Sequence, residues 1–373
     1  MRRVFRILIS GYYGFNNIGD ESILTAVVDN LRAKLSDIEI TVLSKSPAVT
    51  AEKHSVRTAD RKSPGAIMAA VRRCDLLISG GGSLLQDVTS KKSLLYYLAI
   101  IWAGYLFRKR VFIYSQGIGP INLKINRRLT AWTLKRAAGV VVRDEASAEF
   151  LTQIGLLREN VTVTADPVLR IKKAGLDSGR KILENEGFVK EEGKLVVGFA
   201  VREQKLQSEF VNELCLSIER LNAEYGAQVL LIPFHYSEDL PVIEEIERRL
   251  PDKVLAVKHK YLTEEMLSII GGVDILVGVR LHALIYAAVM DVPMIAISYD
   301  PKINSFMHSL GLKAMSAVSD FKCDYFMEEF EKTVENADTI KGMVRENVCA
   351  LIKKLDTNEK MIGDLMKVTD HGE

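Results

Sequence analysis

The sequence predicts an α/β protein built from parallel, doubly wound sheets in two domains. Short apolar runs alternate with segments of helical periodicity, a pattern typical of parallel sheets covered by helices. The alternation weakens once, in a charged, glycine-containing stretch over residues 171–192, and then restarts. A length of 373 residues with 48% hydrophobic residues is sufficient for two globular cores. We therefore expect an N-terminal domain over 1–172, a C-terminal domain over 173–340, and a helical segment over 341–373 that packs back across the domains.

In the first half, five apolar runs each end in a small or polar turn before a helical pattern. Parallel strands aim their carboxyl ends at one edge of the sheet, so these turns should lie together. The runs are FRILIS, DLLIS, VFIYS, GVVV and VTVT, and the turns after them begin at Gly11, Gly80, Gln116, Arg143 and Ala165.

The first turn, Gly11–Glu21, lacks the GxGxxG spacing of dinucleotide-binding loops. Its acidic residues at the helix start would repel a pyrophosphate. Asn16, Asn17 and Asp20 suit sugar hydroxyls. Alternatively, Asp20 is a helix N-cap and the asparagines only shape the turn. The residues alone leave both interpretations open.

The second turn contains three consecutive glycines, Gly80, Gly81 and Gly82, followed by Ser83. Such a loop permits close backbone approach to a ligand, and free N–H groups at a helix start could hold an anion or a hydroxyl. The alternative is a tight turn between a strand and a helix.

Residues 91–110 have an apolar centre with cations on both sides. The centre is shorter than the roughly 20 apolar residues that span a bilayer. Two interpretations remain: a buried helix with solvated ends, or an in-plane contact with an anionic membrane surface.

In the second half, several apolar runs end in a cation or a titratable residue. Each such residue alone is most simply a solvated strand end, but several in one parallel sheet would converge on one crevice. Two arginines and a lysine predict a ligand with more than one anionic group, and histidines could transfer protons. The residues are Arg202, His235, Arg280, His282 and Lys302.

Composition limits the class of partner and the compartment. A net charge of +2 does not predict a nucleic-acid partner. The cysteines Cys74, Cys215, Cys323 and Cys349 form no CxxC pair, which fits a reducing cytoplasm rather than a zinc site. The N-terminal MRRVFRILIS leads directly into a glycine turn, so we interpret it as a strand and not a signal peptide. We expect a cytoplasmic protein, at the inner face of the cell membrane if residues 91–110 contact lipid.

Taken together in order and spacing, seven motifs resemble the polysaccharide pyruvyl transferases, most closely the bacterial cell-surface-anchoring (CsaB) type. The resemblance runs from about residue 4 to about residue 312. The motifs are GYYGFNNIGDE, GGGSLLQD, SQGIGP, RDEAS, ADPV, GFAVRE and GVRLHAL.

This resemblance implies two Rossmann-like domains facing a cleft, similar to the GT-B glycosyltransferases. It also implies phosphoenolpyruvate as donor and a 4,6-ketal of pyruvate on a sugar, N-acetylmannosamine of a lipid-linked disaccharide in secondary cell wall polymer synthesis. No redox cofactor is needed, and nothing in the sequence demands a metal. The implied roles are donor binding by Arg202 and Arg280, acid/base chemistry at His282, and an acceptor side at Asn17 and Asp20.

The strand-end argument adds His235 and Lys302 to the donor site. On the acceptor side we expect binding by Asn16, Asn17, Gly81, Gly82 and Gln116, with Asp20 joining His282 as a catalytic residue. Two rival functions remain. One is a GT-B glycosyltransferase with a nucleotide sugar, for which Asp300 is the one tempting ribose ligand. The other is a non-catalytic carbohydrate-binding protein of the same fold.

Overall fold

The computed structural model describes residues 4–88, 91–202 and 207–370, and these form two compact units. The N-terminal unit comprises residues 1–168 together with 351–373, and the C-terminal unit comprises residues 169–350. The last helix, α14 (Ala337–Asp370), contributes residues to both units. Glu203 of the GFAVRE motif lies outside the described residues.

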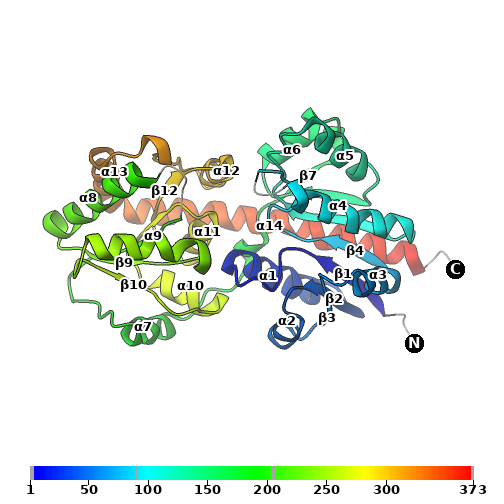
Figure 1. Ribbon diagram of the computed structural model, residues 1–373, viewed down its shortest axis with the longest axis horizontal. Helices are drawn as coiled ribbons and strands as arrows, with labels where there is room; N and C mark the ends of the chain where they lie inside the picture. The colour runs from blue at the N-terminus through cyan, green and yellow to red at the C-terminus, as the bar shows by residue number, and fades with distance from the viewer. Residues whose placement is uncertain (1–3, 89–90, 203–206, 371–373) are drawn as a thin grey trace. The chain divides into compact units, whose positions relative to one another are not determined.

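Within its described residues, the N-terminal unit has a seven-stranded sheet in the order β3-β2-β1-β4-β5-β6-β7, and every strand pair is parallel (Figure 1). The order reverses between β1 and β4, which is the switch point of a doubly wound sheet. Its elements are β1 (Phe5–Ser10), α1 (Ile18–Lys34), β2 (Ile38–Ser44), α2 (Pro47–His54), β3 (Arg57–Asp60), α3 (Pro64–Arg73), β4 (Leu76–Ser79), α4 (Lys91–Leu106), β5 (Arg110–Gln116), α5 (Lys124–Leu134), β6 (Gly139–Val142), α6 (Glu145–Gln153) and β7 (Thr162–Val163), with short 3-10 helices at Arg158–Asn160 and Pro167–Arg170.

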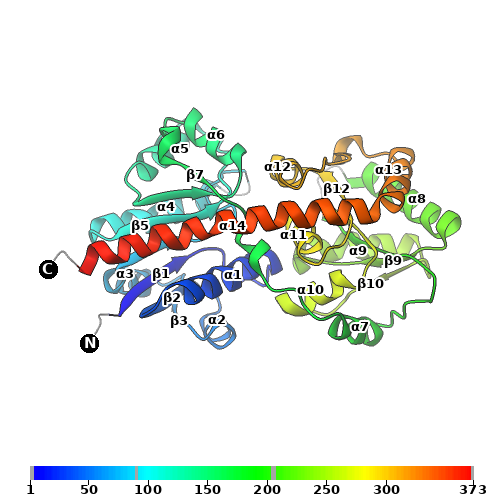
Figure 2. The same cartoon turned by 180° about the vertical axis from the view of Figure 1, so that it is seen from behind.

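Side chains of β5 alternate between the two faces of this sheet. Val111 and Ile113 join a core with apolar residues of α3, α4, α5 and α6. Tyr114 points to the other face, where its hydroxyl donates a hydrogen bond to Glu359 of α14. The later part of α14 therefore covers the face opposite to α4, and Figure 2 shows it in front of β5.

Within its described residues, the C-terminal unit has a six-stranded parallel sheet in the order β10-β9-β8-β11-β12-β13. Most inner strands of the two sheets are apolar runs, as expected for strands buried on both faces. Its elements are α7 (Leu176–Asn185), β8 (Val196–Ala200), α8 (Gln207–Tyr225), β9 (Gln228–Leu231), α9 (Tyr236–Arg249), β10 (Val254–Ala256), α10 (Thr263–Gly271), β11 (Ile275–Gly278), α11 (Leu281–Val289), β12 (Met294–Ser298), α12 (Pro301–Ser309), β13 (Ser316–Ala317), a 3-10 helix (Val318–Asp320) and α13 (Cys323–Glu335).

The core of this unit lies between the sheet and α8, α9 and α13. Phe199 of β8 packs against Phe326 of α13 with ring centroids 6.1 Å apart. On the other side, Ser268 of α10 donates to the backbone carbonyl of Gly175 and accepts from the Gly179 amide of α7. Helices cover both faces of the sheet, so the polar side chains that follow the strands lie at its carboxyl edge.

Two sequence-based expectations about local structure are corrected. Asp20 is not the N-cap of α1, because Asn17 caps it by accepting from the Gly19 amide at 3.1 Å. The glycine triplet does not start a helix either, since α4 begins only at Lys91. Asp20 is thereby left in the first turn of α1, without a capping role.

Candidate functional site

In the C-terminal unit, three cationic or titratable side chains from neighbouring strand ends meet at one carboxylate, Glu238. The Oε2 atom of Glu238 lies 3.0 Å from Nη2 of Arg280 and 3.8 Å from Nη2 of Arg202. Its Oε1 atom lies 3.2 Å from Nδ1 of His235. These residues follow β11, β8 and β9, so the structure brings together three of the five predicted donor-side residues.

Asp239, next to Glu238 in the first turn of α9, holds the Arg280 guanidinium through a buried ion pair. Its side chain is fully buried, and Oδ1 accepts from Nε of Arg280 at 3.1 Å. Its Oδ2 accepts from the backbone amides of Phe234 at 3.0 Å and His235 at 2.7 Å. One carboxylate therefore orients the guanidinium and the loop that carries His235.

Arg202 is held by an aromatic residue at the next strand end. Its Nη1 donates to the Tyr299 hydroxyl at 2.8 Å, and its guanidinium lies 4.8 Å from the Tyr299 ring centroid. Stacking and hydrogen bonding restrict the side chain while leaving it partly exposed, as an anion-binding arginine requires.

The electrostatics of the cluster favour an anion. Desolvation raises the pKa of Glu238, but the hydrogen bond and charge of Arg280 outweigh it, so this pKa lies below its usual range. Burial lowers the pKa of Arg280, and Asp239 more than compensates. The cluster therefore stabilises a negative charge at the position that the half-exposed Glu238 carboxylate fills.

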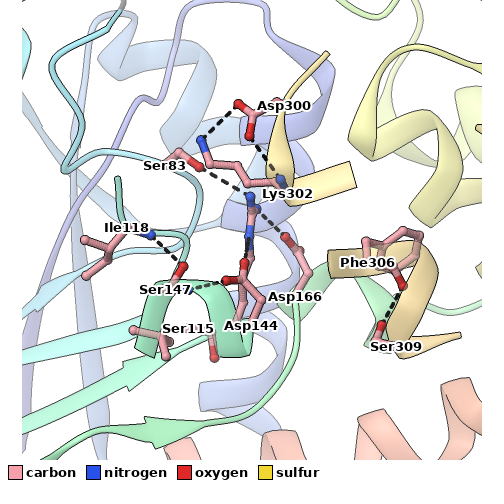
Figure 3. Close-up of polar contacts among 12 residues, drawn as sticks. Ser83, Ser115, Ile118, Asp144, Ser147, Asp166, Asp300, Lys302, Phe306 and Ser309 are labelled. Atoms are coloured by element: carbon pink, nitrogen blue, oxygen red, sulfur yellow. Dashed lines mark hydrogen bonds and ion pairs between the residues drawn. The ribbon is translucent and has the colours of Figure 1, made fainter. Parts of the chain in front are cut away.

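The other two predicted donor-side residues, Lys302 and His282, also follow strands of this sheet, but they have different partners from the residues around Glu238. Lys302 stands in the first turn of α12, with Nζ 3.5 Å from Oδ2 of Asp300 (Figure 3). Asp300 caps α12 by accepting from the Lys302 amide. His282 is half-buried in the first turn of α11, two residues after Arg280.

In the N-terminal unit, Asp20 is the central titratable group of the carboxyl edge. Burial raises the pKa of Asp20 to about 7, with a further increase from Glu21, while Arg143 and Arg61 act in the opposite direction. A carboxyl group with this pKa is partly ionised near neutral pH and can exchange a proton with a substrate hydroxyl.

Of the predicted acceptor-binding residues in the glycine loop, Gly82 lies against this carboxyl group. Gly82 has a φ of +86°, and a Cβ at this position would lie 3.1 Å from Oδ1 of Asp20. Gln116 is fully buried, and its Nε2 donates to the Gly80 carbonyl at 2.7 Å and to Ser79 Oγ at 2.9 Å. Gln116 thus holds the glycine loop in place beside Gly81.

The two predicted asparagines have different positions. Asn17 is engaged in the α1 cap, whereas Asn16 is exposed. Asn16 adopts a left-handed φ of +59°, a conformation that asparagine tolerates better than most residues.

Sequence reasoning missed the buried arginine beside these loops. Nη1 of Arg143 lies 2.8 Å from Oδ2 of Asp166, its Nε lies 3.5 Å from Asp144, and its Nη2 donates to Ser83 Oγ at 3.3 Å (Figure 3). The signal was present, because Arg143 directly follows the run GVVV and Asp166 follows VTVT, just as Arg202 and Arg280 follow theirs. Glu238 and Asp239 were missed as well.

No metal site accompanies these groups in residues 4–88, 91–202 and 207–370, where three or more His, Cys, Asp or Glu side chains nowhere gather in a way that could hold an ion. In the same part of the chain, no helix has the length and apolar character needed to cross a bilayer.

Comparison with known sequences gives one family. The profile described as Polysaccharide pyruvyl transferase matches residues 17–301, about three quarters of the chain. The Amylovoran biosynthesis protein AmsJ of Erwinia amylovora is 20% identical over 425 residues, covering 97% of this chain and 99% of that protein. The matched range includes the Asp20, Arg143, Arg202 and Arg280 positions.

Comparison with solved structures confirms the predicted fold class of two parallel-sheet domains of the GT-B type. HepE of Anabaena in complex with UDP-glucose superimposes with a TM-score of 0.67 at 13% identity, covering 97% of this chain and 99% of that chain. UDP-GlcNAc 2-epimerase of Neisseria meningitidis, bound to UDP-GlcNAc, gives a TM-score of 0.65 at 14% identity, with the same coverage. At this identity the likeness concerns the fold alone.

Proposed function

The chain belongs to the polysaccharide pyruvyl transferase family, and on this premise we propose that it transfers the pyruvyl group of phosphoenolpyruvate to a sugar as a 4,6-ketal, with release of phosphate. The observation that carries the proposal is the convergence of Arg202, His235 and Arg280 on the single carboxylate of Glu238. Phosphoenolpyruvate presents a carboxylate and a phosphate, the two kinds of anion that arginines bind by paired hydrogen bonds.

In the proposed donor complex, one anionic group of phosphoenolpyruvate takes the position of the Glu238 carboxylate. Arg280, fixed by Asp239, binds this group, and Arg202 binds the second anionic group from its place on Tyr299. Lys302 adds a positive charge from the next strand end. These charges favour departure of the phosphate because negative charge accumulates on it as its bond to C2 breaks.

The reaction needs a proton for the donor methylene and acceptors for the protons of two sugar hydroxyls. His282 protonates the donor methylene, which becomes the methyl group of the ketal, and C2 gains oxocarbenium character. One sugar hydroxyl then attacks C2 while Asp20 accepts its proton. Phosphate leaves with its bridging oxygen and takes the proton held by Asp20. The second hydroxyl attacks C2 and gives its proton to His282, which closes the ketal ring and restores both side chains. The pKa of Asp20, about 7, suits a base that must work near neutrality.

The acceptor site is assigned to the N-terminal unit. Asn16 is exposed in the loop between β1 and α1 and can bind sugar hydroxyls. Gly81 and Gly82 are assigned to the same site, with Gly82 beside Asp20. Arg143 and Asp166 form a buried pair that holds Ser83 beside this loop. As acceptor we propose N-acetylmannosamine in a lipid-linked disaccharide, within secondary cell wall polymer synthesis of the cell-surface-anchoring type.

The test is incubation of the purified protein with phosphoenolpyruvate and a panel of acceptor disaccharides. We expect phosphate release that depends on the acceptor, and a product that has gained one carboxyethylidene group by mass spectrometry. A matched reaction replaces phosphoenolpyruvate with UDP-sugars, and calorimetry compares the binding of both donor classes.

Each outcome discriminates between the functions considered. Glycosyl transfer from a UDP-sugar without ketal formation would replace the proposal with a nucleotide-sugar transferase. Carbohydrate binding without turnover of either donor would indicate a binding protein. A ketal on a sugar other than N-acetylmannosamine would keep the reaction and change the acceptor.

A further inference from the structure

The outer faces of α4 and α5 in the N-terminal unit carry no residue of the proposed reaction, yet they expose an unusual set of side chains. On α4, Leu95 is 43% exposed and Leu106 is 72% exposed. Ala99 is exposed between them, and Trp102 is half-buried. These four positions follow helical spacing and form one apolar stripe, while Leu94, Leu98 and Ile101 of the same helix face the core.

The exposed face of α5 combines apolar and cationic side chains. Ile125 is 59% exposed and Trp132 is 48% exposed, and they alternate with exposed Arg128 and, just past the end of the helix, Lys135. Arg136 stacks its guanidinium 4.2 Å from the Trp132 ring centroid. We call Leu95, Ala99, Trp102, Leu106, Ile125, Arg128, Trp132, Lys135 and Arg136 the α4–α5 surface.

The two helices form one continuous surface through their tryptophans. The rings of Trp102 and Trp132 meet edge to face with centroids 6.5 Å apart, and Nε1 of Trp102 donates to Thr133 Oγ1 of α5 at 2.8 Å. Figure 1 shows α4 and α5 on the same side of the sheet of this unit. The apolar stripe of α4 and the cations of α5 therefore belong to one patch.

The charged side chains in the stretch of chain that contains α4 and α5 are all positive. Residues 88–143 contain eleven lysines and arginines and no aspartate or glutamate, although the chain as a whole has 50 basic and 48 acidic residues. Within the described part of the chain, no ion pair involves Arg128, Lys135 or Arg136. Their charges are thus available to an external anion.

We propose that the α4–α5 surface docks the protein in-plane onto a bilayer that contains anionic phospholipids. Exposed leucine, isoleucine and tryptophan side chains enter the boundary between headgroups and acyl chains, while flanking arginine and lysine side chains bind lipid phosphates. The exposed apolar stripe distinguishes this occupant from a nucleic acid, which uses cations but offers no hydrocarbon for leucine side chains. None of the described helices can span a membrane, so the contact is peripheral.

Docking in this way would lay both helices along the membrane surface, with their first turns close to the carboxyl edge of the N-terminal sheet. Asp87, in the loop before α4, accepts from the backbone amides of Asn122 at 2.7 Å and Leu123 at 3.1 Å, directly before α5. Both helices therefore begin at the edge of the sheet where Asp20 and the glycine loop lie. A lipid-linked acceptor could reach that edge from the bilayer, whereas the docking itself depends on neither substrate.

The chain provides its own probe, because its two tryptophans are Trp102 and Trp132. The full-length protein is mixed with vesicles of phosphatidylcholine alone or with added phosphatidylglycerol, and tryptophan emission and co-sedimentation are recorded. We expect a blue shift and sedimentation with phosphatidylglycerol vesicles, both reduced at high salt because screening weakens the contact. Phosphatidylcholine vesicles should leave the emission unchanged.

Charge reversal on the surface tests its position. The double variant Arg128→Glu/Lys135→Glu should weaken vesicle partitioning by roughly tenfold or more, given about 1 kcal/mol for each basic residue near an anionic surface. The matched control is Arg180→Glu/Lys181→Glu, two exposed cations of α7 in the C-terminal unit with the same change in charge. Circular dichroism and the thermal midpoint verify that both variants fold.

The apolar stripe is tested separately with Leu95→Ser/Leu106→Ser against Leu216→Ser, an exposed leucine of α8. The proposal is overturned by an unchanged emission spectrum with phosphatidylglycerol vesicles. Equal losses in the α5 and α7 charge variants, or binding to single-stranded RNA or duplex DNA in place of vesicles, would also overturn it. Ketal formation on a water-soluble acceptor should be the same in all variants, so failure of the docking and failure of the proposed reaction are distinguishable.

Discussion

The guanidinium of Arg280 and the buried carboxylate of Asp239 form the innermost ion pair of the donor-side cluster. The same carboxylate accepts from the backbone amides of Phe234 and His235. Both partners are needed, because either one alone would be a buried charge without compensation. The geometry of the cluster therefore depends on the buried Asp239. The Glu238 carboxylate, in contrast, is half-exposed.

We predict that Asp239→Asn lowers the free energy of unfolding by about 3–5 kcal/mol, the range for breaking a buried ion pair. Chemical denaturation measures this change. The control is Asp324→Asn. The Asp324 side chain is 91% exposed and pairs with Arg220 at the surface, so this substitution should lower the free energy of unfolding by no more than about 1 kcal/mol. Equal effects of the two substitutions would contradict the central position of Asp239.

Glu238→Gln should strengthen donor binding. The carboxylate occupies the position proposed for an anionic group of phosphoenolpyruvate, so donor binding must displace it from Arg202 and Arg280. A neutral amide competes less, and we expect the KM for phosphoenolpyruvate and the Ki of phosphate to fall about 3- to 10-fold, equivalent to roughly 1 kcal/mol. Glu247→Gln, whose carboxylate pairs with Lys258, is the control. A rise in both constants would mean that Glu238 organises the arginines and does not compete with the donor.

Asp20→Asn should change how stability depends on pH. An aspartate with a pKa of about 3.9 when unfolded and about 7 when folded binds more protons in the folded state, so stability falls as pH rises between these values. Asparagine does not titrate in this range, so the substitution removes this loss of stability at higher pH. The variant should match the wild type near pH 4 and exceed its free energy of unfolding at pH 8 by on the order of 2 kcal/mol, a value reduced for partial solvent exposure.

Asp87→Asn provides a control of opposite sign. Desolvation raises the pKa of Asp87, but hydrogen bonds from Asn122, Asn126 and Leu123 outweigh it and hold this pKa below its usual range. Its ionised form stabilises the fold above the unfolded pKa, so the substitution should destabilise the protein at pH 8. If both variants shifted stability in the same direction at pH 8, the assigned pKa of Asp20 would be wrong.

The last part of α14 should contribute to the stability of the N-terminal unit. Leu355 and Ile362 are fully buried, and each change to alanine should cost about 2–5 kcal/mol through lost burial and a cavity. Val368→Ala, at a side chain that is 61% exposed, should have little effect. Thermal denaturation compares the three variants, and near-equal midpoints would show that α14 is dispensable for this unit.

Much of the fold could be predicted because buried parallel strands are continuous apolar runs. β1, β4, β5 and β6 were predicted in this way. β3 (Arg57–Asp60) was not among the predicted runs, since this edge strand is polar and partly exposed. The sequence predicted a helical segment over 341–373 that packs back across the domains. Local periodicity could not show which residues of this segment join the N-terminal unit, because that depends on contacts such as the one between Glu359 and Tyr114.

The site could be predicted only in part, for a related reason. Arg202, His235 and Arg280 were found from their positions after apolar runs, and the structure brings them together. Glu238 and Asp239 were missed because acidic residues in a first helical turn are common simply as partners of the helix dipole. Only the three-dimensional contacts show that one of them is buried beneath Arg280 and the other is shared by three neighbours.

His282→Ala tests the proposed acid of the reaction. His282 is the second residue of α11, two residues after Arg280, and an imidazole side chain can donate a proton to the donor methylene near neutral pH. We expect turnover to fall on the order of 100-fold or more, while the Kd for phosphoenolpyruvate from calorimetry changes little, since the arginines carry the binding. The control is His308→Ala, an exposed histidine of α12. Near-normal turnover with unchanged stability would remove His282 from the mechanism, and a loss confined to donor binding would make it a ligand of the donor instead.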